Sequence, residues 1–206
     1  MNMKQVEESN KNVKRGKKDV FLIVLIVLCV LLAILIIFEF CFENKYMSVE
    51  ISGSSMEHTL SDGDVVYADR KAIAQRGDIV VIDVSHYRER DGFEDDFIIK
   101  RVIGLEGDYL RYSDGALFVR YAGETEFKPI EEDYAIGTAK YNFEHQVGQG
   151  EVFFMGDNRD VSKDSSSSKV GIYHVADIVG VVPEWAINSR IHIKRWESFK
   201  SIFKWK

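Results

Sequence analysis

An unbroken run of nineteen apolar residues, Val20 to Phe38, constrains the fold of this chain more than any other feature. A single α-helix of about this length crosses a hydrocarbon core of about 30 Å. A cleaved targeting segment would have a shorter apolar core that ends in small residues, whereas this run is followed by Glu39-Phe-Cys-Phe-Glu43. We therefore expect an uncleaved transmembrane anchor over residues 20–42.

The charges before the apolar run predict its orientation. The basic residues there are Lys4, Lys11, Lys14, Arg15, Lys17 and Lys18, and the acidic ones are Glu7, Glu8 and Asp19. Loops with excess positive charge stay in the cytoplasm. The sequence therefore predicts a single-pass protein of the cell membrane, with residues 1–19 as a basic cytoplasmic N-terminus and an extracytoplasmic domain that begins at residue 43.

The outer region, residues 43–189, has the composition of a mainly antiparallel β domain. Short segments rich in β-branched and aromatic residues alternate with Gly-Asp turns. The predicted strands are Val65 to Tyr67, Asp78 to Val84, Phe97 to Ile103, Tyr109 to Tyr112, Ala116 to Tyr121, Val152 to Met155 and Ile178 to Val182. The charged stretch from His86 to Asp96 is predicted to be a hairpin tip or loop. The acidic stretch from Ala122 to Gly150 is predicted to be a variable insertion, and we expect both stretches to be peripheral.

Composition argues against several classes of function. Both cysteines, Cys29 and Cys41, lie in or beside the anchor, so the outer domain has no disulfide and no thiolate metal site. The five histidines lack paired ligand spacing. A net charge of −6 and the lack of a phosphate-binding glycine loop argue against nucleic acid and nucleotides. We expect no metal and no cofactor.

The apolar segment from Asp96 to Gly104 is predicted to be a strand, and Lys100 is a cation within it. Because side chains alternate along a strand, Lys100 shares a face with Ile98 and Val102, while Arg101 points the other way. Burial lowers a lysine pKa, which allows the amine to act as a general base near neutral pH. The alternative is a lysine whose amine reaches out of the sheet into water.

A serine-rich segment, Ile51 to Leu60, precedes this strand, and a nucleophilic serine needs such a base. Four segments behind the anchor, between Val49 and Pro183, resemble the ordered boxes of type I signal peptidases. They are Ser52-Gly53-x-Ser55-Met56-x-x-Thr59-Leu60, Arg76-Gly77-Asp78-Ile79-Val80, Lys100-Arg101-Val102-x-Gly104-x-x-Gly107-Asp108 and Gly156-Asp157-Asn158-Arg159-x-x-Ser162-x-Asp164-Ser165.

The resemblance implies a β-barrel-like catalytic core and a membrane-bound serine endopeptidase that removes signal peptides from secreted preproteins. Ser55 matches the nucleophile and Lys100 its general base, in a hydrolysis that proceeds through an acyl-enzyme. Ser162 and Asp164 match residues that orient the lysine. The residues that match substrate pockets for small side chains are Met56, Leu60, Ile98 and Ile99. An extended preprotein would bind as an added strand.

Most of these residues also have structural interpretations. The serines around Ser55 could bond their own backbone in a turn, and Asp164 could be a solvated loop carboxylate. Met56 and Leu60 could be core residues. Asp157 and Asn158 are interpreted mainly as turn residues.

The chain departs from the family pattern at several positions. His58 and Glu106 stand where the family usually has proline, and Gly53 where some members have a hydroxyl for the oxyanion hole. Ser166 replaces an arginine, which leaves Asp164 without its expected partner. Lys169 could reach Asp164 if the serine stretch loops out.

The sequence is also compatible with two alternative functions. One is a non-catalytic membrane-anchored β module that binds signal peptides or a partner protein, and another is a structural surface protein displayed on one helix. Residues 190–206 form a basic aromatic tail with helical spacing, which either lies on an anionic bilayer or packs on the β domain. The expected partners are preproteins and lipid, and we expect a monomer.

Overall fold

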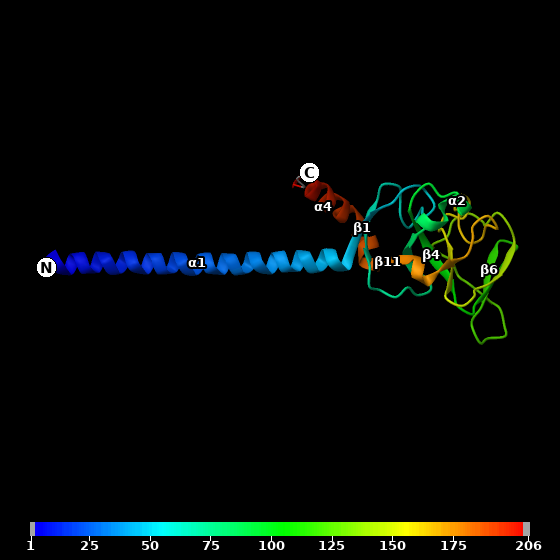
Figure 1. Cartoon of the computed structure of the whole chain (residues 1–206), viewed down its shortest axis with the longest axis horizontal. Coiled ribbons are helices and arrows are strands. Elements are labelled where there is room, and N and C mark those ends of the chain that lie inside the picture. Colours follow the sequence, from blue (N-terminus) through cyan, green and yellow to red (C-terminus); the bar gives the residue numbers. More distant parts are fainter. Residues whose placement is uncertain (1–2, 204–206) are drawn as a thin grey trace. The chain divides into compact units, whose positions relative to one another are not determined.

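The computed structural model describes the backbone of residues 3–203 and the side chains of residues 19–201. The chain divides into two compact units, Met1–Asn44 and Lys45–Lys206. Helix α1 (Met3–Lys45) is continuous (Figure 1), and its part Asp19–Lys45 is long and apolar enough to cross a membrane. The basic side chains expected in the cytoplasm, Lys4 to Lys18, lie outside the described side chains.

The larger sheet of the second unit is antiparallel and has the strand order β1-β2-β11-β3-β4-β9-β10. Its strands are β1 (Tyr46–Glu50), β2 (Val65–Asp69), β3 (Ile79–Asp83), β4 (Phe97–Leu105), β9 (Glu151–Met155), β10 (Tyr173–His174) and β11 (Ile178–Val182). The sheet curls as a half-barrel and stays open, with β1 and β10 at its edges. The prediction of a mainly antiparallel, barrel-like β domain is confirmed.

A second antiparallel sheet has the order β7-β6-β5-β8. Its strands are β5 (Tyr109–Ser113), β6 (Ala116–Arg120), β7 (Lys128–Pro129) and β8 (Phe143–Gln146). All seven predicted strands overlap a strand of the structure. The stretch from Ala122 to Gly150, predicted to be a peripheral insertion, supplies both edge strands of this sheet, because β7 and β8 complete the pairing of β5 and β6.

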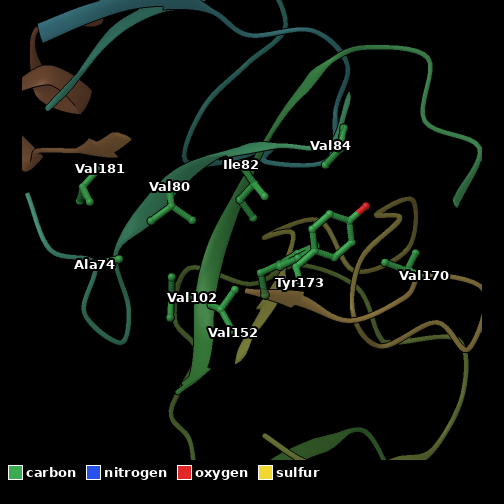
Figure 2. Close-up of a cluster of buried hydrophobic side chains, with 10 residues drawn as sticks. Ala74, Val80, Ile82, Val84, Val102, Val152, Val170, Tyr173 and Val181 are labelled. Atoms are coloured by element: carbon green, nitrogen blue, oxygen red, sulfur yellow. The ribbon is translucent and has the colours of Figure 1, made fainter. Parts of the chain in front are cut away.

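Strand β4 is buried on both faces. Val102 belongs to one hydrophobic cluster with Val80, Ile82 and Tyr173 (Figure 2), and Ile103 belongs to a second cluster. That second cluster also includes Leu110, Leu117, Val119 and Phe153. A strand between two cores needs apolar residues on both faces, which explains the nearly continuous apolar run around Lys100.

The charged stretch from His86 to Asp96 forms helix η1 (Ser85–Tyr87) and helix α2 (Arg88–Asp91). Its expected peripheral position is wrong at Asp91, which is buried. The Asp91 carboxylate accepts hydrogen bonds from the Tyr173 hydroxyl at 2.6 Å and from the Gly171 amide at 3.2 Å. These contacts tie the stretch to β10, because a buried carboxylate must find donors.

The chain ends with helices η2 (Val175–Asp177), α3 (Glu184–Asn188) and α4 (Arg190–Phe203). The helical spacing of the tail is therefore confirmed, and one side of α4 packs on β2. Residues 204–206, and the side chains from Ile202 onward, lie outside the described part of the chain.

Candidate active site

Ser55 and Lys100 meet although 45 residues separate them in the chain. The Lys100 Nζ atom lies 2.9 Å from the Ser55 Oγ atom and 2.9 Å from the Ile99 carbonyl oxygen. Lys100 sits on β4 opposite Val80 and is only 5% exposed. The alternative in which the amine reaches out into water is therefore wrong.

The environment of Lys100 favours the neutral amine. Burial lowers its pKa from an ordinary 10.5 to about 8, against the nearby charges of Asp164 and Asp157, which raise it. With a pKa of about 8, about one amine in ten is neutral at pH 7. A neutral Nζ atom can accept the Ser55 proton, so this pair has the geometry of a nucleophile and its base.

The turn that carries Ser55 is held by Asn158. The Asn158 amide donates to the Ser55 carbonyl at 3.0 Å, and the Asn158 Nδ2 atom donates to the Ser54 carbonyl at 3.1 Å. A side chain at Gly156 would come within 2.5 Å of the Ser55 carbonyl oxygen, so only glycine permits this approach. The interpretation of Asn158 as mainly a turn residue missed this contact between distant segments.

The backbone conformation at His58 explains why proline is absent at this position. Its φ angle is 76°, in the left-handed region. Proline has φ fixed near about −65° and is excluded from this conformation. The turn after Ser55 therefore has a backbone path here that suits a residue other than proline.

The predicted lysine-orienting residues surround a single backbone amide. The Gly156 amide donates to the Asp164 Oδ2 atom at 2.9 Å and to the Ser162 Oγ atom at 3.1 Å. Among the described residues, no hydrogen bond joins Ser162 or Asp164 to Lys100. Asp164 is buried and acts on Lys100 through its charge, so the orienting roles stay predictions.

Ser166 supplies the partner that Asp164 was expected to lack. Its hydroxyl donates to the Asp164 Oδ1 atom at 2.6 Å, and its amide donates to the same atom at 3.1 Å. Lys169 is exposed and forms no ion pair with Asp164 within the described residues. Local hydrogen bonds thus replace the contact suggested for Lys169.

Asp157 is a buried ion-pair partner, and its interpretation as a turn residue was incomplete. The Arg101 guanidinium donates to both of its carboxylate oxygens, at 2.8 and 2.6 Å, and the Thr59 hydroxyl donates at 2.5 Å. Arg101 also donates to the Gly77 carbonyl at 2.7 Å. Arg101 and Asp157 together thus join β4, the turn after Ser55 and the turn before β3.

A groove of about 480 Å³ leads to the pair. Its lining includes Ser55 and Lys100 and three of the four predicted pocket residues, Met56, Ile98 and Ile99. The remaining lining residues are Met47, Ser48, Val49, Glu50, Ile51, Ser52, Val81, Asp95, Asp96 and Phe97. The fourth predicted residue, Leu60, is fully buried and lies outside this lining.

Two strand edges along this groove lack a partner among the described strands. Strand β1 is an edge strand that pairs only with β2. Strand β4 pairs with β9 only from Arg101 onward, so residues 97–100 pair on one side alone, with β3. An extended peptide could add its backbone to such edges.

Comparison with known proteins finds a family of peptidases. Residues 19–186 match the sequence profile of the family described as "Signal peptidase, peptidase S26". Signal peptidase I of Streptococcus pneumoniae is 30% identical over 170 residues, covering 66% of this chain and 79% of that protein. Signal peptidase I U of Bacillus subtilis is 30% identical over 175 residues, covering 81% and 87%.

Among solved structures, a signal peptidase I from Enterococcus faecalis aligns at 25% identity with a TM-score of 0.41, covering 53% of this chain and 97% of that one. The family match itself spans most of the present chain, including Ser55, Lys100 and the Gly156 to Ser165 segment. The chain therefore belongs to the signal peptidase family, peptidase S26, and is a peptidase.

Proposed function

We propose that this peptidase is a membrane-bound serine endopeptidase that removes signal peptides from secreted preproteins, with Ser55 as nucleophile and Lys100 as general base. The observation that carries the proposal is the 2.9 Å distance between the Lys100 Nζ and Ser55 Oγ atoms, at a lysine that is 5% exposed. Burial of the amine provides a base at neutral pH without a histidine.

The proposed reaction uses Lys100 as base and acid in turn. Neutral Nζ accepts the Ser55 proton as Oγ attacks the scissile carbonyl carbon. The resulting ammonium gives a proton to the leaving amine as the peptide C–N bond breaks. In the second half, neutral Lys100 takes a proton from water as the water oxygen attacks the acyl-enzyme ester, and it returns a proton to the Ser55 Oγ atom as the ester C–O bond breaks. The Ser55 amide donates to no acceptor among the described residues, so it can bind the oxyanion.

Substrate binding would use the two open strand edges of the groove. An extended preprotein segment can pair with β1 on one side and with residues 97–100 of β4 on the other. Met56, Ile98 and Ile99 would then limit the size of the side chains next to the cut. Backbone pairing provides affinity for many sequences, while the pockets provide specificity.

Incubation of a secreted preprotein with the detergent-solubilised chain tests this function. We expect the preprotein to lose the mass of its signal peptide, with cleavage at one site identified by mass spectrometry. The Ser55→Ala variant is the control and should bind without cutting. Binding without any mass change by the parent chain would instead support the non-catalytic β module.

The proposed topology places the N-terminus in the cytoplasm and residues 45–206 outside. A protease added to intact cells should digest the outer residues and spare a fragment that contains α1. Epitope tags at each end, detected on blots, would identify the fragments. Protection of residues 45–206 until the cells are permeabilised would contradict both this orientation and the function.

Cleavage should rise with pH because only neutral Lys100 can accept a proton. Below its pKa of about 8, each pH unit should raise kcat/KM about tenfold, with a plateau above it. Initial rates between about pH 6 and 9.5 measure this profile. Asp164→Asn should move the midpoint to lower pH, because it removes a charge that raises the lysine pKa. A parent midpoint near 10.5 would contradict the proposed base.

Ser166 and Lys169 form a matched pair for testing the serine stretch. Ser166→Ala removes the hydroxyl that donates to Asp164 and should lower stability by about 1 kcal/mol, with a shifted pH profile of cleavage. Lys169→Ala should leave both within error, because Lys169 is exposed. Denaturant unfolding and initial rates distinguish the two. A larger effect at Lys169 would mean that it is the partner of Asp164.

A further inference from the structure

One side of α4 is fixed to the β domain. Ile193 is buried, and the Arg190 guanidinium lies 3.0 Å from the Asp64 carboxylate. One turn beyond Ile193, the Tyr67 hydroxyl of β2 donates to the Glu197 carboxylate. These contacts set the rotation of the helix about its axis, so its other side faces away from β2.

That other side carries large apolar residues. Ile191, Trp196 and Phe199 are 66%, 49% and 52% exposed, and the rings of Trp196 and Phe199 stack with centroids 5.9 Å apart. Ile191 and Phe199 are two helical turns apart, with Arg195 between them. An exposed apolar strip of this kind marks an interaction surface.

Charge favours a negatively charged partner for this strip. Residues 190–203 contain four Lys or Arg residues and one Glu, although the whole chain has a net charge of −6. Arg190 is paired with Asp64 and Lys200 with Glu197, whereas Arg195 lies beside the strip. A helix with cations beside tryptophan and phenylalanine has the composition of helices that lie in the interface of anionic bilayers. If a protein partner covered this strip instead, the contact would not depend on the charge of the lipid.

The position of α4 in the domain also favours lipid. The helix packs on β2, which pairs along its whole length with β1, and β1 begins at Tyr46, the residue after α1. With no linker after the membrane-spanning segment, the domain is tethered at the bilayer surface. Tethering raises the effective concentration of the surface, so even a weak interfacial contact becomes populated.

We propose that α4 binds the anionic phospholipid surface of the membrane in which the chain is anchored. Ile191, Trp196 and Phe199 would enter the boundary between headgroups and acyl chains, and Arg195 would contact lipid phosphates. The proposal rests on the membrane anchoring in the proposed function and is independent of its chemistry. The chain would then have a second membrane contact, through α4, besides α1.

Fluorescence of Trp196 in the reconstituted full chain tests the contact. Trp185→Phe and Trp205→Phe leave Trp196 as the only tryptophan of the three. In vesicles that contain phosphatidylglycerol, we expect quenching by lipids brominated near the headgroup and protection from aqueous iodide. Both effects should weaken in pure phosphatidylcholine and at high salt.

Matched variants distinguish the apolar contribution to the contact from the contribution of charge. Ile191→Ser with Phe199→Ser should abolish the quenching by brominated lipid. Arg195→Gln, which removes the cation between Ile191 and Phe199, should weaken the contact about fivefold. Lys128→Gln, which removes an exposed cation on β7, should leave it unchanged.

Two results would overturn the proposal. One is equal access of iodide to Trp196 in both kinds of vesicle. The other is protection from iodide without bromine quenching, which would identify a second copy of the chain as the partner. Cleavage of a preprotein by the same samples reports separately on the proposed enzyme, so failure of either proposal is recognised by itself.

Discussion

Ser55→Ala and Lys100→Ala should each lower kcat/KM for preprotein cleavage by at least about 10³-fold, because each removes one half of a unit that works only as a pair. The Oγ atom forms the acyl bond, and the Nζ atom 2.9 Å away is the group placed to take its proton. Lys100→Arg should fail as completely, since a guanidinium stays protonated at any usable pH.

The double variant provides the sharper result. Ser55→Ala with Lys100→Ala should be no slower than either single variant, because the second change removes a group that has already lost its role. Ser54→Ala is the matched control in the same turn and should retain activity, since the structure uses only its backbone carbonyl. Urea unfolding of all variants checks that the fold is intact. Normal cleavage by the Lys100→Arg variant would contradict the role of Lys100 as the general base.

Arg101→Met should lower the free energy of unfolding by about 3–5 kcal/mol, because it leaves the Asp157 carboxylate buried without its counter-ion. Asp157 has no exposed surface, and the Arg101 side chain is only 12% exposed. The same change loosens the turn after Ser55, since Thr59 bonds to the same carboxylate. Urea unfolding followed by tryptophan fluorescence measures the loss.

Two controls test whether the unpaired buried charge causes the loss of stability in Arg101→Met. Arg88→Met removes the Arg88 partner of Asp96 in an exposed pair, and it should cost no more than about 1 kcal/mol. Adding Asp157→Leu to Arg101→Met should recover part of the stability, because the unpaired buried charge is then gone. Strictly additive losses would show that the two residues stabilise the fold independently.

Much of the fold could be predicted from local patterns. The nineteen apolar residues predict α1 because no globular core of this size needs such a run. The seven predicted strands are found because β-branched segments ended by Gly-Asp turns have few other stable conformations. Strands β1, β7, β8 and β10 were missed. β7, β8 and β10 have two to four residues, which carry too little pattern to distinguish them from loops, and β1 follows α1 directly without a turn signal.

The candidate site was predictable only in part. Lys100 is a visible anomaly, a cation inside an apolar strand, and the ordered boxes supplied Ser55. The roles of Asn158 and Asp157 were hidden, because each depends on a partner about a hundred residues away in the chain. Ser166 was seen only as a missing arginine, since nothing local shows that its hydroxyl reaches Asp164.

The sequence by itself determined the long apolar helix, the β character of the domain that follows it and the unusual position of Lys100. These follow from short-range alternation and hydrophobicity, which each segment carries alone. Only the tertiary structure decided that Ser55 lies beside Lys100 and that two strand edges flank the groove. Pairing of β3 with β4 buries Lys100, and the contact of Asn158 with the Ser55 turn completes the site, so its geometry depends on how distant segments pack.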